Sequence, residues 1–372
     1  MKISLSKDAL QQALQNLAKA MPGRSTVPIL NSVLFEAEEN ALVLRATDLE
    51  ITMVIRLNVN IRETGSVAIP HRVLMETTNA MPETDLSIEA DEKWRVTIDT
   101  DFGSYDISGS DGDEFPAIPE VDDKKEVVVP SETLERLIGK TVFALSSDEL
   151  KPALMGTLFE FREDSITAVA TDGHRLSICS RSDQSSGGYR GEIIVPRKFL
   201  QLVLQHMHEE KEIVLWIGEN HVTVSFGDMT VFTRIIDERY PDYRTVLPQE
   251  QDKIVKANRE DLLAAVRRVA IFSNRSTRQI TLKFSTEENS ISTEDPERAS
   301  SAKEKIDLEY EGDELLIGYN AAYLGDLLSH LDTDKVIMRL KTSVSAGLIV
   351  PETQVENEEL TMLLMPMRTT AQ

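Results

Sequence analysis

The chain has 372 residues, of which 41% are hydrophobic, so it is long enough for two to three domains that each bury a core. No apolar run approaches the ~18 residues of a membrane span, and residues 1–14 hold no apolar signal core, so we expect a cytoplasmic protein. The single cysteine excludes an internal disulfide, and the net charge of −23 argues against a chain that binds nucleic acid with its whole surface.

Apolar spacing predicts six amphipathic helices along the chain, over residues 6–20, 71–80, 131–145, 196–208, 259–274 and 321–331. Ser6 fits the N-cap position of the first helix, while Pro70 and Pro196 begin the second and fourth, where a missing N–H does no harm. Branched and aromatic residues predict strands between the helices, for example over 32–36, 41–46, 95–98 and 222–226. Two helices among many strands in each third of the chain indicate an α+β fold, with helices covering one face of antiparallel sheet.

The same pattern occurs three times along the chain. The segment from Pro28 to Asp48 shares nine residues, at identical spacing, with the segment from Pro152 to Asp172, 124 positions later. The third copy is fainter, but Leu74 and Leu200 have Leu324 as a third counterpart. Because this period is far longer than that of a solenoid, we infer that one domain is triplicated.

Acidic, turn-prone segments at 111–125 and 249–253 are the natural linkers, so we predict three domains, 1–125, 126–252 and 253–372. A short acidic insert at 351–359 is predicted to be an exposed loop. The six predicted helices together carry a charge of +3, which leaves the acidic excess to the strands and loops. A weakly basic surface within an acidic body is therefore compatible with the composition.

Four segments carry a resemblance to a known family. Residues 170–176, 194–198, 240–244 and 365–368 read ATDGHRL, IVPRK, YPDYR and MPMR. In this order and spacing they resemble the bacterial DNA polymerase III β subunit family, the sliding clamps, and the resemblance runs from Met1 to Arg368.

The resemblance implies a noncatalytic processivity factor without a cofactor. Two chains would meet head to tail as a homodimer, and their six domains would form a ring around double-stranded DNA, with strands outside and twelve helices lining the hole. The implied partners are the DNA polymerase III α subunit, the clamp loader, and other polymerases, ligase and mismatch-repair proteins that insert short peptides.

Basic residues on or beside the helices are the candidates for contact with DNA phosphates, which needs no base readout. The resemblance places Arg24, Arg197 and Lys198 where the family touches DNA, and Arg72, Arg136, Lys140, Arg267 and Arg268 are further candidates. The alternative is that they are ordinary solvated helix residues. Asp148, Pro152 and Ala153 stand where family members often have a glutamine and paired tyrosines, so DNA contact by that loop stays open.

A second candidate site is an apolar cleft for partner peptides. Residues 360–367 form an apolar run with three methionines, which suit a surface that accepts varied partners, and Pro366 fits an edge position. A plain core strand is the alternative. By resemblance, the cleft is lined by Leu154, Thr171, Gly173, His174, Arg175, Leu176, Pro241, Val246, Asn320, Tyr323, Val344, Leu363, Met365, Pro366, Met367 and Arg368. Thr245 stands where an arginine is usual, so that edge is predicted to be less basic.

Tyr105 and Ile107, on a predicted edge strand, and Ile271 and Phe272, at a helix end, are the candidates for the subunit interface. Head-to-tail contacts between identical subunits generate a ring when the last subunit meets the first. An exposed edge strand can pair with other chains and aggregate, and pairing it across a subunit interface prevents this. Ordinary core positions are the alternative.

An enzyme would need a catalytic or metal motif, and we predict neither. Asp172 with His174, or His206 with His208, could be imagined as metal ligands, but the Thr-Asp pair recurs at Asp48 without a histidine. No phosphate-binding loop or hydrolase motif occurs. The alternative class is a scaffold of repeated domains that binds only proteins.

Overall fold

The computed structural model describes residues 1–118, 123–184 and 186–368, and these fall into two compact units. Unit 1 comprises residues 1–131 and 198–235, and unit 2 comprises residues 132–197 and 236–372. The second predicted domain is thus divided between the units, because one of its sheets continues into the first third of the chain and the other into the last third. No described helix has the length and apolar character needed to cross a membrane.

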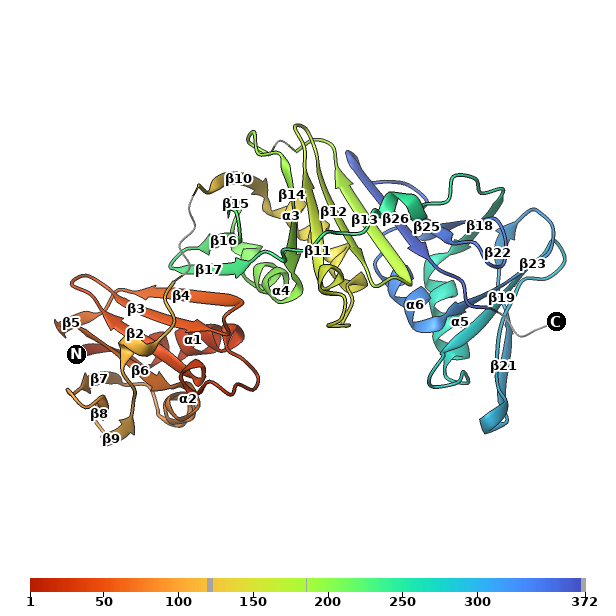
Figure 1. The fold of residues 1–372 in the computed structure, drawn as a ribbon. Helices are drawn as coiled ribbons and strands as arrows, with labels where there is room; N and C mark the ends of the chain where they lie inside the picture. Colours follow the sequence, from red (N-terminus) through yellow and green to blue (C-terminus); the bar gives the residue numbers. More distant parts are fainter. Residues whose placement is uncertain (119–122, 185, 369–372) are drawn as a thin grey trace. The chain divides into compact units, whose positions relative to one another are not determined.

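The described residues form six α-helices at the predicted places: α1 (Lys7–Leu17), α2 (His71–Ala80), α3 (Ser131–Gly139), α4 (Arg197–His206), α5 (Arg259–Ala270) and α6 (Ala321–Ser329) (Figure 1). Ser6 caps α1, as predicted, through a hydrogen bond of 3.3 Å from the Ala9 N–H to Oγ. The predicted ends of α1 and α3 are too long. Beyond Leu17 and Gly139 the chain makes short 3₁₀ turns, over Ala18–Ala20 and Val142–Ala144.

Unit 1 holds two antiparallel sheets (Figure 1). The five-stranded sheet has the order β5 (Asn60–Glu63), β1 (Lys2–Ser6), β7 (Asp85–Ala90), β8 (Arg95–Thr100) and β9 (Gly103–Ser108). The eight-stranded sheet has the order β10 (Lys125–Pro130), β15 (Glu212–Ile217), β16 (His221–Phe226), β17 (Met229–Arg234), β4 (Ile51–Leu57), β3 (Leu42–Thr47), β2 (Ser32–Ala37) and β6 (Gly65–Pro70).

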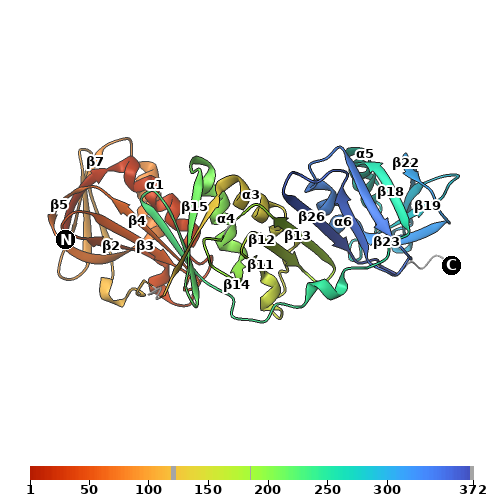
Figure 2. The same cartoon turned by 90° about the horizontal axis from the view of Figure 1, so that it is seen from above.

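Unit 2 holds the other two antiparallel sheets of the described residues. The nine-stranded sheet has the order β14 (Gly191–Pro196), β11 (Gly156–Phe161), β12 (Ile166–Thr171), β13 (Arg175–Arg181), β26 (Glu358–Leu364), β25 (Gly347–Pro351), β24 (Lys335–Leu340), β18 (Lys253–Asn258) and β22 (Leu308–Tyr310). The four-stranded sheet has the order β21 (Ser300–Lys305), β20 (Ser290–Asp295), β19 (Gln279–Phe284) and β23 (Leu315–Asn320). Figure 2 shows α5 and α6 beside each other, next to these strands.

Two strand pairs join different thirds of the chain. In the first joint β4 pairs with β17, so that Met53 lies opposite Val231. In the second joint β13 pairs with β26, so that Ser177 lies opposite Met362. Two strands at the ends of sheets, β9 and β21, have one neighbour each, namely β8 and β20.

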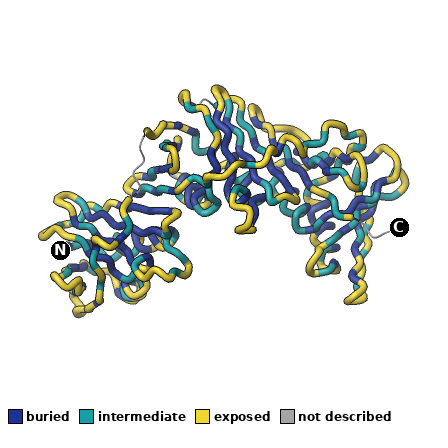
Figure 3. The backbone as a smooth tube through the Cα atoms, viewed as in Figure 1, coloured by how far each residue is buried: buried dark blue, intermediate teal, exposed yellow. Residues whose placement is uncertain are grey.

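Buried residues concentrate in the strands and on the sheet-facing sides of the helices (Figure 3). The α1 helix shows why: Leu10, Ala13, Leu14 and Leu17 repeat at helical spacing and are all buried, whereas the positions between them are polar. The large fully buried side chains include Phe35 in the eight-stranded sheet, Phe199 on α4, and Phe284 and Tyr319 on neighbouring strands of the four-stranded sheet. Each layer therefore contributes its own apolar face to a core.

Two features of the last third differ in part from the prediction. The apolar run 360–367 belongs to a central strand as far as Leu364, because β26 lies between β13 and β25, and Pro366 follows the end of that strand. In the insert 351–359, residues 352–357 are exposed, but the side chain of Glu358 is only 1% exposed. A buried carboxylate needs partners, and these are described below.

Candidate functional site

The segment from Thr171 to Arg175 forms a tight turn between β12 and β13. The Thr171 hydroxyl donates to the carbonyl of Arg175 at 2.6 Å and accepts the N–H of Gly173 at 3.0 Å. Asp172 accepts the N–H groups of His174 and Arg175 at 2.8 and 3.0 Å. Gly173 has a φ of +90°, which favours glycine.

The first copy of the motif builds the same turn. The Thr47 hydroxyl donates to the carbonyl of Ile51, and Asp48 accepts the N–H groups of Glu50 and Ile51. The repeated Thr-Asp pair therefore shapes a turn in both copies. No group of three or more potential ligands lies close enough to hold a metal ion within the described residues.

Arg175 links this turn to α6. Its guanidinium pairs with Asp172 at 3.2 Å and with Asp326 at 2.5 Å, and it donates to the carbonyl of Phe143 at 2.9 Å. It also lies over the rings of Tyr323, at 4.7 Å, and of Phe143, at 5.4 Å. Because this side chain is only 9% exposed, its orientation is fixed by contacts on all sides.

An apolar cluster lies on one face of the nine-stranded sheet. Its buried members are Leu158, Val169, Leu176, Ile194, Tyr243, Ala346 and Leu363. Partly buried side chains pack against them, namely Ala153, Ile178, Ile236, Tyr240, Leu247 and Leu348. The cluster therefore brings together strands from the second and third thirds of the chain.

The C-terminal segment crosses from this cluster toward α6. Beyond β26, the Met365 N–H donates to the carbonyl of His174 at 2.9 Å, and the Met367 N–H donates to the carbonyl of Gly318 at 2.8 Å. The His174 ring stacks on Tyr323 with centroids 5.9 Å apart. Asn320 caps α6 by accepting the N–H groups of Ala322 and Tyr323.

All sixteen residues predicted for the cleft lie in unit 2. Leu176 and Leu363 belong to the apolar cluster, and Leu154 is also buried. Val246, Val344 and Met365 are large apolar side chains that stay exposed, at 52%, 68% and 41%. Pro241 and Arg368 are exposed as well. Sequence reasoning missed Phe143 and Asp326, because only the fold brings them to Arg175.

Two of the basic residues predicted to contact DNA lie close together in unit 1. Arg24 is exposed in the loop after the 3₁₀ turn Ala18–Ala20, and among the described residues it has no ion pair or hydrogen bond. Lys198 pairs with Asp48 and donates to the carbonyl of Met21 at 3.3 Å, so its ammonium is held beside the same loop. Arg72, on α2, is 88% exposed and pairs with Glu76 at 2.9 Å.

Arg197 supports the loop that follows the 3₁₀ turn Val142–Ala144. Its guanidinium donates to the carbonyls of Leu145 and Ser146 at 2.7 and 3.3 Å. Burial, together with the charge of Arg175, lowers its pKa. The loop ends in Leu150, whose side chain is 90% exposed.

Arg136 and Lys140 are already engaged with acidic residues of the last third. Arg136 makes two hydrogen bonds to Glu358, at 2.6 and 2.7 Å, and one to Asp332 at 2.8 Å. Lys140 donates to Asp332 at 2.5 Å and to the carbonyl of His330 at 2.7 Å. Their contact with DNA stays a prediction, and these ion pairs count against it.

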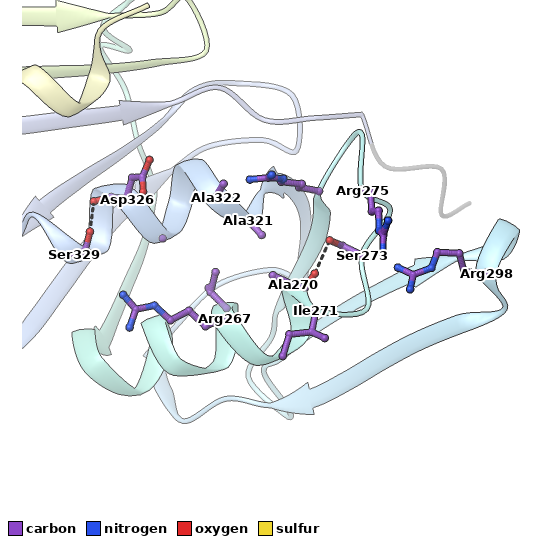
Figure 4. Close-up of a pocket in the computed structure, with 13 residues that line it drawn as sticks. Arg267, Ala270, Ile271, Ser273, Arg275, Arg298, Ala321, Ala322, Asp326 and Ser329 are labelled. Carbon is purple, nitrogen blue, oxygen red and sulfur yellow. Dashed lines mark hydrogen bonds between the residues drawn. The ribbon is translucent and has the colours of Figure 1, made fainter. Parts of the chain in front are cut away.

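A second basic group combines Arg267, which was predicted as a DNA contact, with three arginines that were not found from the sequence. A groove of about 800 Å³ runs between α5 and α6 and is lined by Arg267, Arg275, Arg278 and Arg298, with Asp326 at its other end (Figure 4). None of the four guanidinium groups has an ion pair or hydrogen bond to another described residue. Arg268, one position further along α5, instead pairs with Glu304.

The predicted interface residues divide into exposed and buried ones. Ile271 and Phe272 follow α5 and are 72% and 43% exposed, and Tyr105 on β9 is 37% exposed. β9 is an edge strand, as predicted. Ile107 is only 7% exposed because it faces the core of its own domain, which matches the alternative reading for that residue.

Comparisons with known proteins agree along the whole chain. The N-terminal, central and C-terminal domains of the DNA polymerase III beta subunit family match residues 1–119, 128–242 and 244–368. The beta sliding clamps of Pseudomonas aeruginosa and Escherichia coli K12 are each 32% identical over 370 and 372 residues, covering 99% of this chain and 100% of theirs.

Solved structures agree in fold. A P. aeruginosa sliding clamp bound to griselimycin superposes with a TM-score of 0.90 at 31% identity, covering 99% of this chain and 100% of that one. The Bacillus subtilis clamp superposes with a TM-score of 0.92 at 24% identity, covering 99% of each. These matches confirm the resemblance and the α+β fold of three clamp domains, each with two helices on antiparallel sheets. The chain belongs to the DNA polymerase III beta subunit family, the beta sliding clamps, which are the noncatalytic processivity factors of that polymerase.

Proposed function

We propose that two copies of this chain close head to tail into a ring that encircles duplex DNA in the cytoplasm and tethers the DNA polymerase III α subunit. The observation that carries the proposal is the pairing of strands between the thirds of the chain. Each internal joint pairs a strand of one third with a strand of the next, and β9 in the first third and β21 in the last are among the sheet-end strands that lack such a partner. A contact between two different edges of one chain is heterologous, and it makes a ring when it closes.

The proposed DNA contacts are Arg24, which has no partner among the described residues, and the arginines of the α5–α6 groove. We also propose Arg72, Arg197 and Lys198, although these side chains already contact Glu76, two backbone carbonyls and Asp48 respectively. Because a closed ring stays on DNA without high affinity, weak and sequence-independent phosphate contacts suffice. The net charge of −23 then keeps DNA from binding elsewhere on the surface.

The proposed docking site for partner peptides is the apolar cluster with its exposed rim of Val246, Val344 and Met365. Apolar side chains of a short peptide would pack there, and Arg175 and His174 would form the polar wall. The clamp loader, other polymerases, ligase and mismatch-repair proteins are the proposed competitors for it. We also propose 1–125, 126–252 and 253–372 as the domain boundaries.

Two measurements test the ring. The mass in solution should be about twice 41.7 kDa at micromolar concentration. After loading by a clamp loader, the protein should stay on circular DNA and leave once that DNA is linearised. A persistent monomer, or equal retention on circular and linear DNA, would contradict the ring and favour a scaffold that binds only proteins.

A further inference from the structure

The strands of the three thirds correspond residue by residue. The hairpins β3–β4, β12–β13 and β20–β21 pair Leu42 with Leu57, Ile166 with Arg181 and Ser290 with Lys305. Each pair lies 124 positions after the one before it. The hairpins β8–β9 and β16–β17 likewise correspond, with an offset of 126, since Arg95 pairs with Ser108 and His221 with Arg234.

The two internal joints use these equivalent strands in the same register. Met53 of β4 is equivalent to Ser177 of β13, and these two residues pair with Val231 and with Met362 in their joints. The ladder hydrogen bonds also have the same phase. In the first joint the Arg56 N–H donates to Asp228 and the Arg234 N–H to Glu50, and in the second the Met365 N–H donates to His174.

The contacts between helices at the two joints also involve equivalent positions. In the first joint the Lys19 ammonium lies 3.3 Å from Nε2 of His206. In the second joint the Phe143 ring stacks on the His330 ring with centroids 3.8 Å apart. Phe143 is 124 positions after Lys19, and His330 is 124 positions after His206, so contacts of different chemistry occupy one structural position.

From this equivalence, and resting on the ring proposed above, we infer the register of the joint between subunits. β21 pairs antiparallel with β9 of the partner subunit so that Ser301 lies opposite the partner's Tyr105 and Lys305 opposite the partner's Asp101. The register follows because β21 takes the place of β4 and β9 takes the place of β17. The same mapping brings Ile271 against the partner's Ala80.

The side chains fit this register. Lys305 and the partner's Asp101 are oppositely charged, at the position where Arg181 and Glu358 pair at 3.8 Å in the second joint. Ser301 is small and the partner's Tyr105 large, as Ser177 is small and Met362 large. Ile271 is 72% exposed in the single chain, so packing against an alanine would cover an apolar side chain. A shift of one residue would turn every side chain to the other face.

Cysteine pairs can read this register directly. In both internal joints the equivalents of Ser301 and Tyr105 form a non-hydrogen-bonded pair, in which Cα atoms are about 4.5 Å apart. That separation suits a disulfide, whereas an offset of four residues adds about 13 Å along the strand. The native Cys179 is buried, and burial raises the pKa of its thiol to about 12, so it should stay unreactive.

The experiment pairs four substitutions in two ways. The matched variants are Ser301→Cys with Tyr105→Cys, and Lys305→Cys with Asp101→Cys. The mismatched controls recombine the same changes, as Ser301→Cys with Asp101→Cys, and Lys305→Cys with Tyr105→Cys. The mass of each reduced variant is measured first, and the yield of covalent dimer is then measured after mild oxidation.

We expect at least about tenfold more covalent dimer from the matched variants than from the mismatched ones. If the reduced proteins are dimers but the mismatched pairs cross-link as well or better, the register is wrong while the ring stands. If the wild-type protein is a monomer at micromolar concentration, the ring itself fails. Should Tyr105→Cys alone disrupt the dimer, the pair at Lys305 and Asp101 still decides the register.

Discussion

The two internal joints share one backbone geometry but differ in what fills it. The first joint is apolar at its centre, where Met53 and Val231 are both fully buried, and the polar contacts described at its periphery include Lys19 with His206 and Lys198 with Asp48. The second joint contains ion pairs, because Arg136, Arg181 and Lys140 surround Glu358 and Asp332. The comparison teaches that the strand ladder sets the position of the joint, while the side chains can change without moving it.

Removing the central carboxylate of the second joint should have the largest effect. Glu358→Ala would leave the buried Arg136 guanidinium without its main partner, so we expect the free energy of unfolding to fall by about 3–5 kcal/mol. Urea denaturation measures this loss. Glu359→Ala is the matched control, since Glu359 is exposed and should cost less than about 0.5 kcal/mol. Equal losses in both variants would mean that the ion pairs do not hold this joint.

The apolar joint should depend on packing instead. Met53→Ala removes a fully buried side chain, and we expect a loss of about 3 kcal/mol in the free energy of unfolding. This loss should be the same in low and high salt, because the substitution removes no charge. Met365→Ala, at a side chain that is 41% exposed, should cost less than about 1 kcal/mol. A salt-dependent Met53→Ala effect would contradict the distinction between the joints.

DNA binding should distinguish basic side chains without an acidic partner from those that are already ion-paired. Arg24 has no partner among the described residues, so Arg24→Gln should lower the salt dependence of duplex binding by about 0.9 in log-log slope. Arg136→Gln should leave that slope unchanged and lower the free energy of unfolding instead, because the Arg136 guanidinium is paired with Glu358 and Asp332. Binding titrations over a series of salt concentrations measure both slopes. A lower slope for Arg136→Gln would show that this arginine also reaches phosphate.

The smallest expected effect is a response to mild acid in the first joint. Burial, together with the Lys19 ammonium, lowers the pKa of His206 from its ordinary value of 6.5. Below pH 6.5 the unfolded chain binds a proton that the folded joint resists, so stability should decrease as pH falls from 7.5 to 5.5. His221, whose pKa is lowered by burial and Arg234, acts in the same direction.

The Asp332 carboxylate of the second joint should not respond in this range. Burial alone would raise the pKa of Asp332, but hydrogen bonds from Lys140 and Arg136 outweigh it and leave the pKa below 3.8. The stability that this carboxylate contributes is thus present above pH 3.8 and is lost only as pH falls further. Melting curves of the wild type and of His206→Gln at pH 7.5 and 5.5 test the contrast. An identical loss in both proteins would remove His206 as a cause.

Local features of the fold could be predicted from the sequence, whereas the joints could not. Helix starts were right because caps and prolines act within one turn, as Ser6 and Pro70 do. The end of α3 was misplaced because the apolar spacing continues into the 3₁₀ turn Val142–Ala144. Local patterns also could not show that β26 is central, since its neighbour β13 comes from another third of the chain.

The candidate sites divide in the same way. The sequence predicted that the apolar run 360–367 and the ATDGHRL segment belong to one site, and the fold brings both to one face of a sheet. The engagement of Arg136 was hidden because its acceptors lie 196 and 222 positions away. Three arginines of the α5–α6 groove were missed, because Arg275, Arg278 and Arg298 lie outside the predicted helices, whereas Arg267 was predicted as a DNA contact.

The covalent path of the chain distinguishes the three kinds of joint in the proposed ring. At β4–β17 and at β13–β26 the thirds that meet are also tied by peptide, so a broken ladder leaves them tethered and able to re-form. Between β9 and β21 no peptide bond crosses. The ring would therefore open to admit DNA most easily between β9 and β21, because no covalent link has to stay in place there. The two strand ladders within each chain would remain paired while the ring is open.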